Sequence, residues 1–167
     1  MKKMKKILLV FIVALSLNGF AQQKELVWHT DVNKAINISN QSGKPLFLFF
    51  TGSDWCGPCK RLTSSVFKQP EFSKWATKNL VLVELDFNIA TRKKIQAARA
   101  GQATLSKKEQ EMIELQQTLN VRGYPTGWFV KAEKVNGKIN LTQIDKLGYV
   151  NGGANAWINL ASQIINK

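Results

Sequence analysis

The chain has 167 residues, of which 24 are lysine or arginine and 11 are aspartate or glutamate, so its net charge is +13. This length is sufficient for one domain with a hydrophobic core, and no internal repeat or low-complexity linker indicates a second domain. The basic residues are scattered and form no nucleic-acid-binding motif. We therefore interpret the charge as a solvated surface and expect no nucleic-acid partner.

Residues 1–21 have the composition of a cleaved export signal. Four lysines and no acid lie in residues 1–6, and residues 7–17 form an almost unbroken apolar run of eleven residues. Gly19 and Ala21 are the small residues that a signal peptidase recognises. The run is shorter than the ~20 residues that span a bilayer as a permanent helix, although an uncleaved anchor is the alternative. We predict a signal peptide here and a periplasmic or secreted mature chain.

The mature chain, residues 22–167, retains 20 basic and 11 acidic residues and a charge of +9. Its apolar periodicity and its turn residues predict alternating strands and helices. The continuous apolar residues at 46–50 indicate a central strand that is covered on both faces. In chain order we expect a strand at 26–29, a helix at 31–41, the strand at 46–50, helices at 57–66 and 70–78, and a strand at 80–87.

Residues 88–120 are polar and charged and predict two helices, at about 90–100 and 106–119. Ser106 and Glu109 have the spacing of a capping box, which places the start of the second helix. This insert either shapes a surface for a partner or forms a solvated helical hairpin.

Two strands and a final helix follow the insert. Asn136-Gly137 is a strong hairpin signal between strands at 126–134 and 138–146. The last helix, at about 154–165, has apolar residues at helical spacing: Trp157, Leu160, Ala161 and Ile164. The order of strands and helices is that of a layered α/β fold.

The only two cysteines, Cys56 and Cys59, flank Gly57-Pro58 at the start of the helix that follows the central strand. This spacing allows the sulfurs to form a disulfide across a tight loop, as a dithiol–disulfide switch requires. The start of a helix lowers the pKa of the first thiol, which makes its thiolate available near neutral pH. We therefore predict Cys56 as the exposed attacking nucleophile and Cys59 as the shielded thiol that resolves the mixed disulfide.

Two other uses of the cysteine pair are open. Zinc needs three or four protein ligands, but the chain offers two cysteines and the distant His29, which we expect at the surface or at a strand edge. A structural disulfide is the other alternative, although a bridge that closes a four-residue loop gives little chain-entropy stabilisation. No glycine-rich phosphate loop is present. We expect no metal and no organic cofactor, so the redox group would be the Cys56–Cys59 disulfide itself.

Two motifs together resemble the thioredoxin superfamily. They are Trp-Cys-Gly-Pro-Cys-Lys at 55–60, after an apolar strand, and Gly-Tyr-Pro-Thr at 123–126, before the hairpin. The resemblance covers residues 26–167 and implies a thioredoxin fold: an α/β protein with a central mixed β-sheet flanked by helices and a helical insert before the cis-Pro loop. The residues around the cysteines, 52–62, are similar to exported thioredoxin-like domains such as the C-terminal domain of the transmembrane thiol reductant transporter.

The resemblance implies roles for the residues beside the cysteines. Trp55, Gly57 and Pro58 would form the active-site loop, with Trp55 covering its edge. Pro125 would follow a cis peptide bond and lie against that loop, with Tyr124 and Thr126 also contacting the substrate.

The reaction of Cys59 also requires a proton acceptor. Many thioredoxins have a buried aspartate six residues before the first cysteine, but that position is Phe50 in this chain. Glu84, on the next central strand, is the acid that could serve instead. A carboxylate paired with a lysine at the strand end is the alternative for Glu84, and water could replace the aspartate.

The Gly57-Pro58 pair is that of reducing thioredoxins, whose potential is about −270 mV, whereas oxidising relatives usually have a histidine there. We therefore predict an exported protein-disulfide reductase. Its partners would be proteins with disulfides and a membrane thiol protein that donates electrons, and we expect a monomer. A disulfide oxidase or isomerase, or a non-redox binding module on the same scaffold, are the alternatives.

Overall fold

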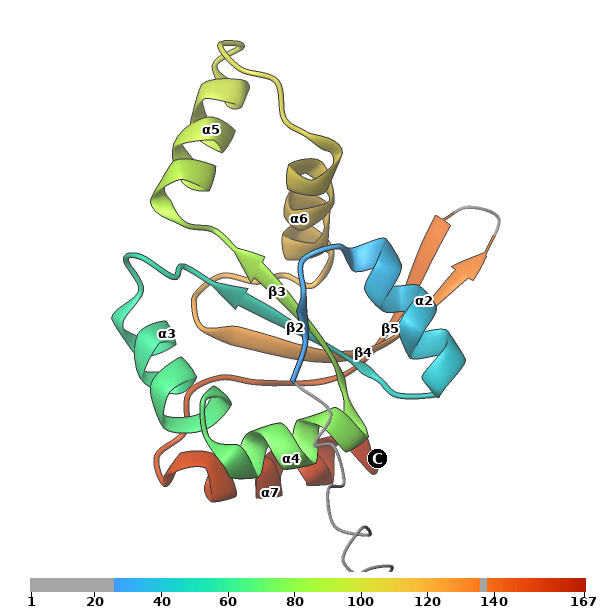
Figure 1. Cartoon of the computed structure of the whole chain (residues 1–167). Helices are drawn as coiled ribbons and strands as arrows, with labels where there is room; N and C mark the ends of the chain where they lie inside the picture. Colours follow the sequence, from blue (N-terminus) through green and yellow to red (C-terminus); the bar gives the residue numbers. More distant parts are fainter. Residues whose placement is uncertain (1–25, 136–137) are drawn as a thin grey trace, which may run out of the picture.

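The structure, a computed structural model, describes residues 26–135 and 138–167. Within these ranges it contains one sheet of five strands in the order β1-β3-β2-β4-β5 (Figure 1). The strands are β1 (Trp28–His29), β2 (Leu46–Thr51), β3 (Val81–Asp86), β4 (Thr126–Val135) and β5 (Lys138–Leu147). Strand β3 runs parallel to β1 and β2, whereas β4 is antiparallel to β2 and β5. No helix in the two ranges is long and apolar enough to cross a membrane.

Helices pack on both sides of this sheet, so the molecule has three layers (Figure 1). One side has α2 (Val32–Ser42), α5 (Ile89–Arg99) and α6 (Lys107–Thr118). The other side has α3 (Gly57–Leu62), the π-helical segment η1 (Thr63–Phe67), α4 (Pro70–Asn79) and α7 (Gly153–Ile165). The predicted mixed sheet flanked by helices is confirmed, and α5 and α6 form the predicted insert, which projects past the end of β3.

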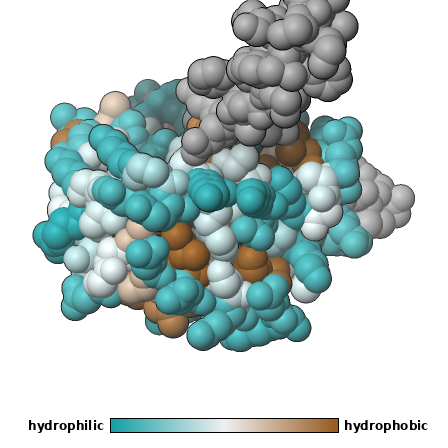
Figure 2. Space-filling model, turned by 60° about the horizontal axis from the view of Figure 1, so that its bottom comes forward, coloured by the Kyte–Doolittle hydropathy of each residue, from teal (hydrophilic) through white to brown (hydrophobic). Residues whose placement is uncertain are grey.

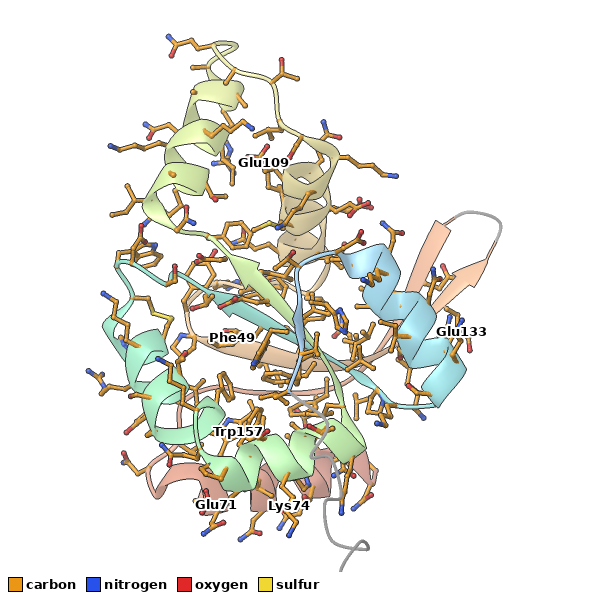
Figure 3. All side chains as sticks on the ribbon, in the orientation of Figure 1. Phe49, Glu71, Lys74, Glu109, Glu133 and Trp157 are labelled. Atoms are coloured by element: carbon orange, nitrogen blue, oxygen red, sulfur yellow. A yellow bond between two sulfur atoms is a disulfide. The ribbon has the colours of Figure 1, made fainter. Side chains whose placement is uncertain are left out.

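Strand β2 is buried along its whole length, and its side chains alternate between the two layers. Leu48 and Phe50 belong to the α2 side, whereas Phe47 and Phe49 belong to the α3 and α7 side. The rings of Phe47 and Trp157 meet edge to face at 5.4 Å, and Figure 3 shows Phe49 and Trp157 in the same layer. Because both faces of β2 are packed, the loop that follows it starts from a fixed position.

The predicted helices and strands are all present among the described residues, with boundaries that differ by one or two residues, except in one helix. The helix predicted at 57–66 is α-helical only over α3 and continues as η1. The hydroxyl groups of Ser64 and Ser65 both donate to the carbonyl oxygen of Arg61, and such bonds compete with the α-helical pattern. The predicted signal peptide and the Asn136-Gly137 turn lie outside the described residues.

Helix α7 buries three of the four apolar residues that stand at helical spacing in the sequence. It buries Ala154, Trp157, Ala161 and Ile164, whereas Leu160 is 39% exposed. The buried residues are three or four positions apart, and Leu160 falls outside that stripe. Figure 2 views the molecule from the side of α4 and α7, and it shows hydrophobic surface as separate patches in a mainly hydrophilic face.

Candidate active site

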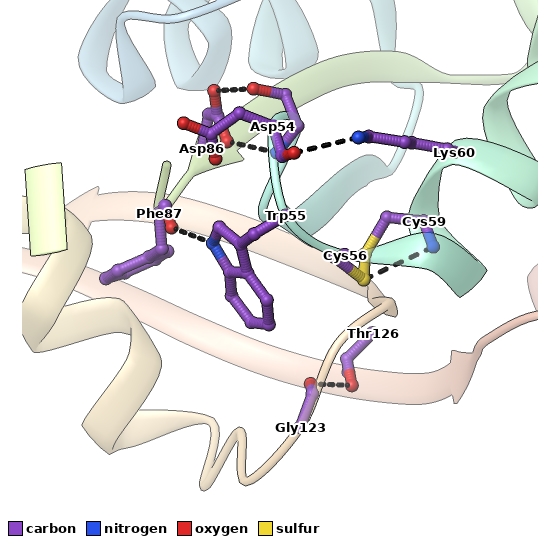
Figure 4. Close-up of a disulfide and its surroundings, with 10 residues drawn as sticks. Asp54, Trp55, Cys56, Cys59, Lys60, Asp86, Phe87, Gly123 and Thr126 are labelled. Atoms are coloured by element: carbon purple, nitrogen blue, oxygen red, sulfur yellow. Dashed lines mark hydrogen bonds between the residues drawn. A yellow bond between two sulfur atoms is a disulfide. The ribbon is translucent and has the colours of Figure 1, made fainter. Parts of the chain in front are cut away.

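The chain turns sharply after β2 and places the two cysteines at the start of α3. The amide of Cys56 donates to the carbonyl oxygen of Gly52 at 2.8 Å, which closes the loop. Cys56 is the N-cap residue of α3, and its Sγ accepts a hydrogen bond from the Cys59 amide at 3.2 Å. The two sulfurs form a disulfide, with the Cα atoms 5.2 Å apart (Figure 4). Gly57 and Pro58 are the first helical residues, where the missing N–H of proline removes no helical hydrogen bond.

Both cysteines are buried in this disulfide form. Cys56 is 4% exposed and Cys59 is 1% exposed, so the prediction that Cys56 is an exposed thiol is wrong for this state. The loop folds back towards Gly52, and both cysteines join the apolar cluster that contains Phe49 and Leu62. Cys56 therefore differs from Cys59 by its capping position and not by its exposure.

Trp55 forms the edge of the disulfide loop. Its indole N–H donates to the carbonyl oxygen of Phe87 at 2.8 Å (Figure 4). Its ring meets the ring of Tyr124 edge to face at 5.6 Å. A Cβ added at Gly52 would overlap the indole, so glycine is what leaves room for Trp55. The structure thus brings together one residue from each of the two sequence motifs.

Two aspartates that the sequence analysis did not single out hold this loop against the end of β3 (Figure 4). The Asp86 carboxylate accepts hydrogen bonds from the amide and the hydroxyl of Ser53, at 2.9 and 2.6 Å. The Asp54 carboxylate accepts from the amide of Ile89 at 3.0 Å. The Asp54 carbonyl oxygen accepts from Nζ of Lys60 at 2.8 Å. In the sequence, Asp54 could have been noticed because it lies beside the cysteine motif, and Asp86 because it ends an apolar strand.

The second motif leads into β4. The peptide bond between Tyr124 and Pro125 is cis. The Thr126 hydroxyl donates to the carbonyl oxygen of Gly123 at 2.8 Å, close to the disulfide loop (Figure 4). The Tyr124 hydroxyl accepts a hydrogen bond from Gln116 at 2.7 Å, and burial raises the pKa of Tyr124 to about 12. Tyr124 is therefore a neutral, fixed side chain near neutral pH.

Glu84 lies on the same side of the sheet as the cysteines. Its neighbour on β2 is Phe49, which belongs to the cluster around Cys59. Glu84 and Cys59 both line a pocket of about 240 Å³. Burial, reinforced by the Asp86 carboxylate and partly opposed by Lys108, raises the pKa of Glu84. Glu84 forms no salt bridge with any residue that the structure describes, which goes against the alternative of a lysine-paired carboxylate.

Phe50, six positions before Cys56, belongs to the opposite layer. It lies in the cluster on the α2 side and its ring is 6.4 Å from that of Phe87. A carboxylate at position 50 would therefore face away from Cys59, because side chains alternate along a strand. Counting back from the cysteine motif thus identifies the wrong face, and Phe49 is the residue on the cysteine side.

The sole histidine, His29, lies on the edge strand β1, as predicted. Burial and the nearby Lys34 lower its pKa. Over residues 26–135 and 138–167, no three histidine, cysteine or acidic side chains come together as metal ligands would.

The sequence profile of the thioredoxin-like domain family matches residues 32–148, more than half of the chain. The chain belongs to the thioredoxin-like domain family. The match begins in α2 and ends just after β5. The family domain in this protein therefore includes the cysteine loop, the α5–α6 insert and the cis-Pro loop.

Two relatives of this thioredoxin-like chain come from Chlamydia pneumoniae. The disulfide bond reductase DsbH is 32% identical over 126 residues, which cover 75% of this chain and 65% of DsbH. The thioredoxin-related protein DsbJ is 34% identical over 90 residues, which cover 51% of this chain and 26% of DsbJ. The chain thus spans less than two thirds of either relative.

Solved structures share the thioredoxin-like fold of this chain. A structure of a DsbH oxidoreductase superposes with a TM-score of 0.67 and 26% identity, and the match covers 85% of each chain. A thioredoxin from Thermus thermophilus superposes with a TM-score of 0.55 and 16% identity, covering 84% of this chain and 87% of the thioredoxin. The second likeness shows the fold alone.

Proposed function

We propose that this thioredoxin-like protein is an exported thiol–disulfide oxidoreductase that reduces disulfides in other proteins. The observation that carries the proposal is the Cys56–Cys59 disulfide at the start of α3, where the Cys59 amide donates to Cys56 Sγ. In the reduced protein, this amide and the helix start stabilise a thiolate at Cys56. The Gly57-Pro58 pair and the name of the DsbH relative, a disulfide bond reductase, support the reducing direction.

Reduction of a substrate proceeds in two thiol–disulfide exchanges. The Cys56 thiolate attacks one substrate sulfur, so a Cys56–substrate disulfide forms and the other substrate sulfur leaves as a thiolate. Cys59 then loses its proton and attacks Cys56 Sγ, which forms the Cys56–Cys59 disulfide and releases the remaining substrate sulfur. Two electrons pass to the substrate. A partner dithiol must return two electrons to the cysteine pair before the next cycle.

Glu84 accepts the proton that Cys59 loses. The two residues line the same pocket of about 240 Å³, which is large enough for a bridging water molecule. The raised pKa of Glu84 brings the carboxyl group closer to the pKa of a thiol, so the transfer is less unfavourable. No other acidic residue lines this pocket among the described residues.

The remaining parts of the proposal concern contacts and location. The Tyr124 backbone, with Pro125 and Thr126, pairs with an extended segment of the substrate beside the loop. The signal peptide at 1–21 directs the protein to the periplasm or the exterior, where a membrane thiol protein supplies electrons. The protein works as a monomer, and the cysteine pair is its redox group without a metal or organic cofactor.

The reduction potential of the cysteine pair tests the direction of electron flow. The mature protein, residues 22–167, is equilibrated with a glutathione series and the fraction of disulfide is measured. A value near about −270 mV supports a reductase, whereas a value near about −120 mV indicates an oxidase or isomerase. A cysteine pair that does not change its redox state across the series would support the alternative function, a non-redox binding module. Mass spectrometry of the exported protein tests the cleavage before Gln22.

A further inference from the structure

A groove lies between the disulfide loop and the α5–α6 insert. We call it the α5–α6 groove: it has a volume of about 590 Å³ and is lined at one end by Trp55 and Tyr124 and along the insert by Ile89, Arg92, Lys93 and Arg99, among others. The Ile89 side chain is 46% exposed at this surface. The groove thus combines apolar surface with cations and opens beside the redox site.

The charge of the α5–α6 groove has one sign. Three of its lining residues are cations, Arg92, Lys93 and Arg99, and no residue of the lining is acidic. These cations form no salt bridge with any other described residue. The basic residues of the whole chain are scattered, but these three lie together on α5 and line the groove that reaches the disulfide loop at Trp55.

The acids of the neighbouring helix α6 do not neutralise this charge. Glu109 is held by Lys94 at 2.7 Å and by the Ser106 amide and hydroxyl, and Figure 3 shows it between the two helices of the insert. Glu111 accepts a hydrogen bond from Asn33 of α2 at 2.8 Å. None of the α6 acids lines the groove. An anionic group that enters the groove therefore meets three lining cations and no lining carboxylate.

The groove is continuous with the redox site. The Arg92 guanidinium lies over the Trp55 ring, 4.6 Å from its centroid, and Trp55 directly precedes Cys56. Tyr124, at the same end of the groove, directly precedes the cis-Pro residue Pro125. A polypeptide joined to Cys56 through a mixed disulfide therefore passes Trp55 to reach the groove.

From this juxtaposition we infer that the α5–α6 groove binds an acidic segment, with apolar residues, that flanks the disulfide of a protein substrate. The inference rests on the proposed function and gives it a substrate class. The three cations attract the acidic residues, and the apolar lining favours segments that also carry apolar residues. Electrostatic attraction of this kind acts mainly on the rate of association and falls with ionic strength.

The test compares disulfide peptides that differ only in the residues beside the disulfide: three glutamates, three lysines or three serines. The reduced mature protein is mixed with each peptide and the second-order rate constant of reduction is measured at low and high salt. We expect the acidic peptide to react about tenfold faster than the serine peptide at low salt, with the advantage lost at high salt. Equal rate constants for the three peptides would overturn the inference while leaving the proposed function intact.

A charge reversal with a matched control locates the effect. In the double variant Lys93→Glu and Arg99→Glu, the advantage of the acidic peptide should disappear while the serine peptide reacts as before. The control, Lys74→Glu with Lys78→Glu on the exposed face of α4, changes the net charge equally and should retain the advantage. An equal loss in both variants would show an effect of net charge, and the inference would be wrong.

A binding measurement separates this inference from the redox proposal. In protein with Cys56→Ser and Cys59→Ser, calorimetry with an acidic, cysteine-free peptide should show binding that the groove reversal weakens about tenfold. Failure of the wild-type protein to reduce even the serine peptide would contradict the proposed function, whatever this binding result. Binding of anionic phospholipid vesicles through the same cations, without discrimination among peptides, would overturn the inference in favour of a lipid surface.

Discussion

Two hollows border the disulfide loop, and they differ in size and charge. The pocket on the α3 side has a volume of about 240 Å³ and contains the inner cysteine, Cys59, with the carboxyl group of Glu84. The α5–α6 groove has a volume of about 590 Å³, reaches the loop at Trp55, and has cations without acids in its lining. One hollow is thus suited to moving a proton and the other to holding a polypeptide.

The loop itself separates these two environments. Trp55 turns towards Phe87 and Tyr124, whereas Cys59 packs into the aromatic layer under the sheet. Because the two hollows share no lining residue among those described, their effects should add independently. Variants in one hollow should leave the step assigned to the other unchanged.

The largest expected effect comes from the cysteines. Cys59→Ser should abolish turnover of disulfide substrates, by at least about 10³-fold, because the mixed disulfide on Cys56 can no longer be resolved. An insulin-reduction assay measures the loss, and non-reducing gels should show the trapped covalent partner. Cys56→Ser is the control, because it should abolish turnover without trapping. If Cys56→Ser instead trapped a partner through Cys59, the roles of the two thiols would be reversed.

The proton acceptor comes next. Glu84→Gln should slow the resolving step by about 10²-fold, the usual size of a general-base contribution, and leave the rate of attack by Cys56 unchanged. Stopped-flow measurements of mixed-disulfide decay report this step. Glu71→Gln, an exposed acid on α4 (Figure 3), is the control and should have no effect. An unchanged decay rate in Glu84→Gln would assign the proton to water.

The pH dependence of the same variant gives a second measurement. The pKa of Glu84 is raised in the folded protein, so the folded state binds this proton more tightly than the unfolded state does. The stability linked to Glu84 is therefore fully present below its unfolded pKa of about 4.3 and lost as pH rises through the folded value. Glu84→Gln should be at least as stable as the wild-type protein at pH 7 and lose that advantage near pH 4 in urea unfolding.

Sequence reasoning succeeded where a local pattern determines the structure. The cysteine spacing placed Cys56 at the cap of α3, and the Ser106 and Glu109 spacing placed the start of α6 with a complete capping box. The apolar run at 46–50 became a strand buried on both faces. Each of these features depends on neighbours within a few residues, so it is visible in a single sequence.

Features that depend on contacts between distant segments were not predictable. The face of Glu84 required the register of β3 against β2, and the burial of Cys56 required its packing in a cluster that includes Trp157 of α7. The loop anchors Asp54 and Asp86 act on partners across the molecule. The charge of the α5–α6 groove depends on which face α5 turns towards the disulfide loop, which helical periodicity alone does not determine.

A substitution at Gly52 tests whether the position of the Trp55 indole matters for stability and for the preference of the α5–α6 groove. Gly52→Ala should destabilise the protein by about 1–3 kcal/mol, the usual cost of overpacking, because the new Cβ overlaps the Trp55 indole. Urea unfolding measures the change. Gly123→Ala is the matched control, because a Cβ there meets no atom within 4 Å. Since Trp55 lines the groove, the preference for acidic peptides should fall in Gly52→Ala, and a retained preference would show that the indole is not needed.

The smallest expected effect is a loss of stability at the start of α6, the second helix of the insert. Ser106→Ala removes the cap of α6 and should destabilise the protein by about 1 kcal/mol, whereas Ser73→Ala inside α4 should be nearly neutral.

The bonds from Lys94 and Ser106 hold the pKa of Glu109 at about 2. This depressed pKa means that its stabilisation is present above about pH 4.3 and lost as pH falls towards 2. The difference between Ser106→Ala and the wild-type protein should therefore shrink over that range in urea unfolding. Resolution by Cys59 should not change, and a slower resolving step in Ser106→Ala would show that the two hollows are coupled.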